Sequence, residues 1–435
     1  MANFFNTVRI TNFKSLKDVT LSDCKRINLL IGKPNVGKSN ILEAIGLFSL
    51  PYFKYNKSKK LTQFIRAENA AELFFDGNID ENITITTDDG SSCTVDYFKQ
   101  KGLVQFRIDL RDQYDQDLNL GRIKIKTTPV IDGEKLANLA ISIEVPDQRL
   151  KESFNIDISK LSKDQLNELY IEGIQKKIED SIVGLDDPQE IENQIKAEFD
   201  KLNSGIWSFP LLSINLDNRL NLTFTNRGRG QSYSNTPKVN FYKFPQTFAF
   251  KKPSIFLHHL LPPSGTNLLE VIEYDKLLEN ELSALFKEYG LKLLFDKTNQ
   301  TLRIDKPLKE NSASFPFSSI ADTLQRIIFF KTAIASSQNS ILLFEEPEAH
   351  CFPPYITHIA KEIIDSESNQ FFIATHSPYI LDTFLEKDRD DLAIYMADFK
   401  DGQTVIKRLT DAELNDVFEY GLDLFFNAEL FTDEI

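Results

Sequence analysis

The chain has 435 residues, of which 41% are hydrophobic and 26% charged, as expected of a globular protein with room for two or three domains. Its 50 basic and 64 acidic residues give a net charge of −14, which argues against a dedicated nucleic-acid coat protein. No apolar run approaches the roughly 20 residues that span a bilayer, and the N-terminus lacks the apolar block of a signal peptide. The three cysteines, Cys24, Cys93 and Cys351, are too far apart to suggest a disulfide framework or a zinc site. We therefore expect a cytoplasmic protein without a membrane partner.

The first motif with candidate functional residues lies near the N-terminus. The strand-like segment RINLLIG leads into GKPNVGKS, and NILEAIGLFSL follows with apolar residues at helical spacing. This order of strand, loop and helix is the context that the phosphate-binding pattern G-x-x-x-x-G-K-S requires. Lys38 would bridge the β- and γ-phosphates, and Ser39 would give its hydroxyl to Mg²⁺. The residues expected to bind a nucleoside triphosphate are Gly32, Lys33, Pro34, Asn35, Val36, Gly37, Lys38, Ser39 and Asn40.

A second motif, ILLFEEPEAHCFPPYI, places two carboxylates at the end of an apolar strand. Adjacent like charges need cations or protons opposite them. A phosphate-binding loop needs one carboxylate for the magnesium shell and another to act on the attacking water. We assign these roles to Glu345 and Glu346, respectively. Glu345 is one methylene longer than the usual Asp, which predicts contact through water or a slightly displaced ion.

The next predicted strand, in NQFFIATHSPYIL, ends just before His376. A histidine at this position can reach the γ-phosphate and report its presence. Because the carboxyl ends of parallel strands meet at one sheet edge, where α/β folds bind ligands, we expect His376 beside the glutamates and the phosphate-binding loop. Glu346, His376 and Lys38 are thus the predicted catalytic residues.

Four segments together carry a family resemblance: VRITNFKSLKDVTL, GKPNVGKSN, LLFEEPEAHCFPP and FIATHSPYIL. In this order they resemble the ABC-type ATPase heads of the SMC/RecF group. The EEPEAH and THSP segments are most similar to those of the overcoming-lysogenisation-defect (OLD)-like ATPases, many of which belong to bacterial anti-phage systems. The resemblance covers about residues 1–75 and 255–410, and it implies ATP as the nucleotide.

The resemblance also implies a homodimer or higher oligomer, in which a signature loop from one subunit completes the ATP site of the other. The candidate loop and helix is FPFSSIADTLQRIIFFKTAI, where Ser318 or Ser319 could cap the helix and touch the partner's γ-phosphate. No glycine follows these serines, a departure from the usual signature. His350 would sense the second subunit. Gln63 and Gln113 are candidates for the glutamine that such heads place beside the metal.

The expected fold is an α/β, ABC-type (SMC/RecF-like) P-loop ATPase head with an antiparallel β-lobe and a helical insertion. We expect residues 1–75 and 256–435 to form its halves and residues 76–255 to hold the lobe and the insertion. Alternating residues around Asp88–Gly90 predict antiparallel strands, and residues 159–202 predict two helices. Arg227 and Arg229 suit either a nucleic-acid contact or a solvated loop. A hairpin at Asp401–Gly402 and a helix from Asp411 complete the prediction.

Three functions fit these patterns. The first is an ATPase whose nucleotide-dependent dimerisation regulates an effector in anti-phage defence. We expect the effector to be separately encoded, because too little chain follows the head to hold a nuclease domain. The second is a RecF-like DNA-binding ATPase in repair. The third is a low-turnover scaffold that senses ATP.

Overall fold

The structure is a computed structural model of the chain that describes residues 5–56, 58–109, 124–132, 135–144, 212–217, 219–225, 238–248, 250, 258–296, 301–307 and 312–432. The chain divides into two compact units. The first comprises Met1–Tyr114, Leu212–Thr225 and Pro237–Ile435, and the second comprises Asp115–Leu211 and Asn226–Thr236.

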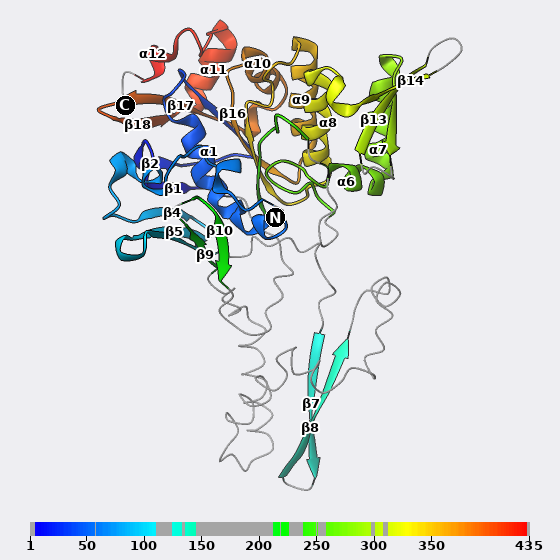
Figure 1. The fold of residues 1–435 in the computed structure, drawn as a ribbon. Helices are drawn as coiled ribbons and strands as arrows, with labels where there is room; N and C mark the ends of the chain where they lie inside the picture. Colours follow the sequence, from blue (N-terminus) through cyan, green and yellow to red (C-terminus); the bar gives the residue numbers. More distant parts are fainter. Residues whose placement is uncertain are drawn as a thin grey trace. The chain divides into compact units, whose positions relative to one another are not determined.

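A six-stranded sheet forms the centre of the first unit (Figure 1). Its order is β11 (Val239–Tyr242), β15 (Ile341–Glu345), β16 (Gln370–Ala374), β3 (Ile27–Ile31), β17 (Leu392–Lys400) and β18 (Gln403–Arg408). The first five strands run parallel, and β18 returns antiparallel to β17 after a turn at Asp401–Gly402, as predicted. Strands β3, β11 and β16 are buried throughout, which explains why each is apolar except for one amide residue.

Helices cover one face of this sheet (Figure 1). They are α8 (Asp322–Ala335), α9 (Pro353–Asp365), α10 (Pro378–Lys387), α11 (Asp411–Tyr420) and α12 (Ala428–Thr432). Helices α6 (Leu268–Tyr274) and α7 (Lys276–Glu288) pack against α8. In α9, Ile356, Ile359, Ala360 and Ile363 are buried, the spacing of a single helical face. The helix from Asp411 begins where the sequence predicts it, with Thr410 and Glu413 forming a capping box. None of the helices described is long and apolar enough to cross a membrane.

Helix α1 (Lys38–Gly46) lies between the six-stranded sheet and a seven-stranded antiparallel sheet, since it contacts β11, β15 and β16 as well as β1. The order of this second sheet is β10 (Leu222–Thr225), β9 (Leu212–Leu216), β6 (Leu103–Asp109), β5 (Ser92–Phe98), β4 (Ile83–Thr87), β1 (Val8–Phe13) and β2 (Leu16–Leu21). Strands β4 and β5 flank the predicted turn at Asp88–Gly90. Because β4 pairs with β1, the predicted β-lobe includes the first strands of the chain and is not a separate segment.

Two smaller sheets complete the described structure. In the first unit, β12 (Lys292–Asp296), β13 (Thr301–Pro307) and β14 (Ser312–Pro316) form an antiparallel sheet. In the second unit, β7 (Lys124–Asp132) and β8 (Lys135–Glu144) form a hairpin. The predicted helices of residues 159–202, together with Gln113, Arg227 and Arg229, lie outside the described residues.

Candidate functional site

The phosphate-binding loop joins β3 to α1 at the carboxyl edge of the parallel sheet. Gly37 precedes α1 with a φ of 100°, and a Cβ added there would lie 2.0 Å from Oγ1 of Thr404. The Thr404 hydroxyl donates to the carbonyl of Val36 at 2.9 Å. It therefore accepts its 2.6 Å hydrogen bond from Ser15. The loop is thus held against β18 by a side chain that leaves room only for glycine at position 37.

The other loop residues divide into those that face the loop interior and those that do not. Lys38 donates to the carbonyls of Gly32 and Lys33 at 2.8 and 2.7 Å, so its ammonium lies inside the loop. Burial lowers the pKa of Lys38 to about 8, although Glu346 raises it. In contrast, Lys33 pairs with Glu429 of α12 at 2.6 Å, and the amide of Asn40 donates to Ser15 at 2.7 Å. These two side chains are engaged away from the loop interior, and Pro34 and Asn35 are exposed at its tip.

The strand ends predicted to converge lie in register. Glu345 pairs with Ala374 at the end of β16, and Ala374 pairs with Leu30 near the end of β3. Glu345 is contacted by Arg66 at 2.8 Å and by Lys243 at 3.2 Å. Burial raises the pKa of Glu345, but Lys243, a hydrogen bond with Ser39 and the charge of Arg66 outweigh it and leave the pKa below its usual value. Glu345 is therefore an ionised carboxylate beside the predicted metal-binding hydroxyl.

Glu346 and His376 face each other across the ends of β15 and β16. Nε2 of His376 is 3.8 Å from Oε1 of Glu346, and both side chains are partly exposed. Glu346 has a φ of 45°, an uncommon conformation for this residue, and its N–H donates to the carbonyl of Ala374 at 2.9 Å. Burial and the charge of Lys38 lower the pKa of His376 despite the attraction of Glu346. The imidazole is thus neutral at pH 7.

Glu348 holds the segment that carries His376. Its Oε1 accepts a hydrogen bond from the Thr375 hydroxyl at 2.6 Å and another from the backbone N–H of His376 at 3.0 Å. Burial raises the pKa of Glu348, in spite of these hydrogen bonds. Oε1 of Glu348 therefore fixes the backbone at His376.

The predicted cap of the signature helix is wrong. Ser318 and Ser319 belong to a 3₁₀ turn, and α8 begins after Ala321 without a side-chain cap. The helix instead reaches the loop after β15: the Thr323 hydroxyl donates to the carbonyl of His350 at 3.1 Å. Arg326 donates to the carbonyl of Glu346 at 3.5 Å. The first turns of α8 thus contact the segment that carries Glu346.

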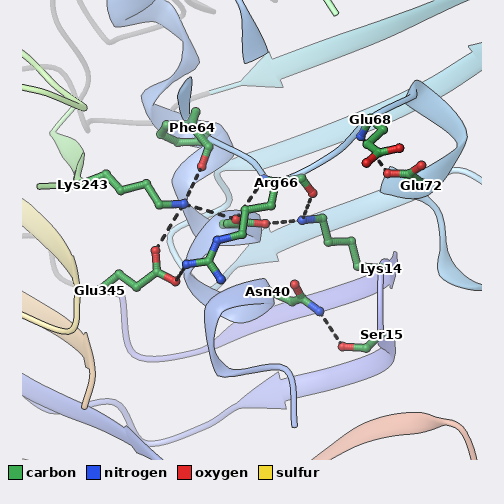
Figure 2. A network of polar contacts seen from close by, with 10 residues as sticks. Lys14, Ser15, Asn40, Phe64, Arg66, Glu68, Glu72, Lys243 and Glu345 are labelled. Atoms are coloured by element: carbon green, nitrogen blue, oxygen red, sulfur yellow. Dashed lines mark hydrogen bonds and ion pairs between the residues drawn. The ribbon is translucent and has the colours of Figure 1, made fainter. Parts of the chain in front are cut away.

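A partly buried ionic network beside Glu345 was not predicted (Figure 2). Lys14 from the β1–β2 turn pairs with Glu43 of α1, whose carboxylate also lies 3.5 Å from the ammonium of Lys243. The backbone N–H of Arg66 donates to Glu43 at 3.2 Å, and its guanidinium pairs with Glu345. Of the two candidate glutamines, Gln63 lies exposed in a 3₁₀ turn, and Lys243 occupies the position beside Glu345. The only sequence signal for Lys243 was its place directly after the short apolar segment VNFY.

The residues of this edge fit a nucleotide with magnesium. The Gly37 cradle leaves no space for a side chain, Lys38 directs its ammonium into the loop, and the loop meets the N-terminus of α1. Ser39 lies close enough to Glu345 to lower its pKa, and the two residues supply a hydroxyl and a carboxylate, the oxygen ligands that Mg²⁺ prefers. Ser39 and Glu345 would hold the metal.

Comparison with known proteins identifies the family. Residues 4–381 match the AAA ATPase domain. The chain therefore belongs to this family: it binds nucleotide and is an ATPase. The family and the sheet topology together confirm the predicted α/β P-loop ATPase head with an antiparallel lobe.

Solved structures similar to this chain include heads of SMC proteins. An SMC head bound to the C-terminal winged-helix domain of ScpA is 14% identical, covers 94% of this chain and 98% of its own, and has a TM-score of 0.39. An SMC head with an extended coiled coil, bound to the C-terminal domain of ScpA from Pyrococcus furiosus, is 13% identical over 96% of this chain and 99% of its own, with a TM-score of 0.40. The SMC head domain from Thermotoga maritima is 9% identical over 93% and 99%, with a TM-score of 0.35. No curated protein matches the chain.

Proposed function

We propose that this ATPase binds ATP with Mg²⁺ at the carboxyl edge of the parallel sheet and hydrolyses it there. The observation that carries the proposal is the convergence of Lys38, Glu345, Glu346 and His376, which come from three strand ends far apart in sequence. Lys38 would contact the β- and γ-phosphates, and the magnesium held by Ser39 and Glu345 would supply charge neutralisation for the phosphates.

Glu346 is the residue placed to take a proton from the attacking water. Its carboxylate is partly exposed and lies next to the neutral imidazole of His376, which can hydrogen-bond to the γ-phosphate. Glu348 holds the backbone N–H of His376, and Arg326 contacts the carbonyl of Glu346, so both groups are fixed by the residues around them. Such preorganisation is the main means by which enzymes accelerate phosphoryl transfer.

Nucleotide binding tests the placement of the site. Lys38→Ala should weaken equilibrium binding of ATP by about 10-fold or more, because a charge-assisted contact to phosphate is lost. Lys33→Ala is the matched control, since Lys33 lies in the same loop but pairs with Glu429. Fluorescence titration with a labelled ATP analogue measures both. Equal affinities of wild type and Lys38→Ala would remove the phosphate-binding role from this loop.

We further propose that ATP closes two copies of the chain face to face and that closure regulates a separately encoded effector. The support is the contact of α8 with the loop after β15, because a partner bound at the start of α8 would act on Glu346 through Arg326 and on His350 through Thr323. Glu346→Gln should form dimers with ATP that dissociate when ATP is replaced by ADP, measured by analytical ultracentrifugation. A protein that stays monomeric with ATP would contradict closure.

Anti-phage defence is the biological setting that we propose, supported by the similarity of the EEPEAH and THSP segments to OLD-like ATPases. Bacteria that carry the gene with its neighbouring genes should show fewer plaques than bacteria that carry the Glu346→Gln variant. Equal plaque numbers for wild type and variant across a panel of phages would argue against this setting while leaving the ATPase site intact.

A further inference from the structure

Lys243 lies opposite Glu345 at the edge of the sheet. Strands β11 and β15 are parallel, with Tyr242 paired to Phe344, so the next residues on the two strands are Lys243 and Glu345. The ammonium of Lys243 is 3.2 Å from Oε2 of Glu345, and the guanidinium of Arg66 is 2.8 Å from Oε1 (Figure 2). Both oxygens of the carboxylate that would hold the metal are therefore in contact with cations of the chain itself.

A second carboxylate is within reach of the same lysine. The ammonium of Lys243 is 3.5 Å from Oε1 of Glu43, and it donates to the carbonyl of Phe64 at 3.4 Å. The side chain of Glu43 is only 1% exposed, so this carboxylate must keep its cations from the protein. Lys243 thus lies between two carboxylates and can give up one of them without becoming a buried unpaired charge.

The two cations at Glu345 differ in how they are held. Arg66 is 69% exposed, and its side chain can move into solvent when a metal approaches Glu345. Lys243 is 23% exposed and is also held by Glu43, 3.5 Å from its ammonium. Of the two, Lys243 is therefore the persistent positive charge next to the predicted metal position.

We propose that Lys243 competes with Mg²⁺ for Glu345 and yields this carboxylate to the metal only when nucleotide phosphates arrive with it. The proposal rests on the proposed role of Glu345 in holding the metal. A bare divalent cation at Glu345 would be repelled by the nearby ammonium, whereas the phosphates of a magnesium nucleotide bring negative charge that offsets this repulsion. Lys243 would then keep its contact with Glu43. The site consequently binds a magnesium nucleotide in preference to a bare divalent cation.

Binding of Mn²⁺, followed by electron paramagnetic resonance of the free ion, tests this competition without measuring hydrolysis. Lys243→Met should bind Mn²⁺ in the absence of nucleotide about 5- to 10-fold more tightly than wild type, the size expected for loss of one partly exposed competing charge. With ADP present the difference should shrink to about 2-fold or less, since the phosphates then offset the charge of Lys243. Lys238→Met, at the opposite end of β11, is the matched control and should behave as wild type.

A further variant should change Mn²⁺ binding in the opposite direction. Glu43→Gln removes the second carboxylate, so Lys243 should hold Glu345 more firmly and Mn²⁺ binding should weaken. If Lys243→Met fails to fold, as judged by its thermal unfolding, Lys243→Gln provides the neutral substitution. Unchanged or weaker Mn²⁺ binding in the neutral variant overturns the competition. If wild type itself binds no Mn²⁺ even with ADP, the proposed function fails and not only the role of Lys243.

Discussion

Gly37→Ala is the substitution whose effect the structure defines most closely. A Cβ at this position would lie 2.0 Å from Oγ1 of Thr404 and 2.8 Å from Oγ of Ser15, and the backbone φ is 100°. Holding alanine at positive φ costs about 1–2 kcal/mol. Moving Thr404 away breaks its hydrogen bonds to Val36 and Ser15, worth about 1 kcal/mol each. The free energy of unfolding should therefore fall by about 3–4 kcal/mol in total.

Gly402→Ala separates the cost of the positive φ from the cost of displacing Thr404. Gly402 also has a positive φ, 79°, but nothing lies within 4 Å of an added Cβ. This variant should lose only the backbone part, about 1–2 kcal/mol, and should bind ATP as wild type does. Gly37→Ala should bind ATP at least about 10-fold more weakly, because the loop must shift to admit the methyl group.

Urea unfolding and ATP titration of both variants provide the assay. Combining Gly37→Ala with Thr404→Ala removes the hydroxyl that clashes, so the double variant should be about 1–2 kcal/mol more stable than the sum of the single effects. If Gly37→Ala proves no less stable than Gly402→Ala and binds ATP normally, the close approach of β18 to the loop is not what fixes glycine at this position.

Three further predictions concern buried ionisable groups. Lys14→Met should lower the free energy of unfolding by about 3 kcal/mol, because Glu43 loses its closest cation; urea unfolding measures this, and a loss under 1 kcal/mol would contradict it. Glu348→Ala should slow hydrolysis about 10-fold without weakening ATP binding, because it releases His376. Glu348→Gln should restore the rate, since an amide oxygen accepts the same hydrogen bonds. Burial and the charge of its neighbour lower the pKa of His259 to about 4. Below about pH 6.5 the imidazole of His259 therefore takes up a proton in the unfolded chain but not in the folded chain. The free energy of unfolding should consequently fall between about pH 6.5 and pH 4, by up to about 3 kcal/mol. The His259→Gln variant should lack this part of the pH dependence in thermal unfolding; an identical dependence would refute the assignment.

The sequence predicted the parts of the site that depend on local pattern. A strand, a glycine-bounded loop and a helix specify the placement of Lys38 and Ser39 because these residues are neighbours in the chain. Glu346 and His376 could be placed together because they follow apolar strands, and parallel strands bring such positions to one edge. The residue roles remain predictions, whereas the α/β ATPase fold is confirmed by the topology and the family.

What the sequence did not predict depends on pairings between distant segments. Lys243 reaches Glu345 only because β11 pairs with β15, and VNFY is too short and apolar to reveal its neighbour. Two serines before a helical pattern suggested a cap, but the chain makes a 3₁₀ turn at Ser318 and Ser319 and starts α8 at Asp322. The acidic side chain of Asp322 at the first turn already favours that start without a serine cap.

The rate of ATP hydrolysis by Glu346→Gln tests the central claim most directly. Single-turnover hydrolysis should slow by about 10²-fold or more, as expected for loss of general-base assistance, while ATP binds with the affinity of wild type. Glu367→Gln, an exposed carboxylate before β16 at the other edge of the sheet, should hydrolyse ATP normally. A Glu346→Gln variant that hydrolyses ATP at the wild-type rate would contradict the proposed role of Glu346 and with it the assignment of the catalytic edge.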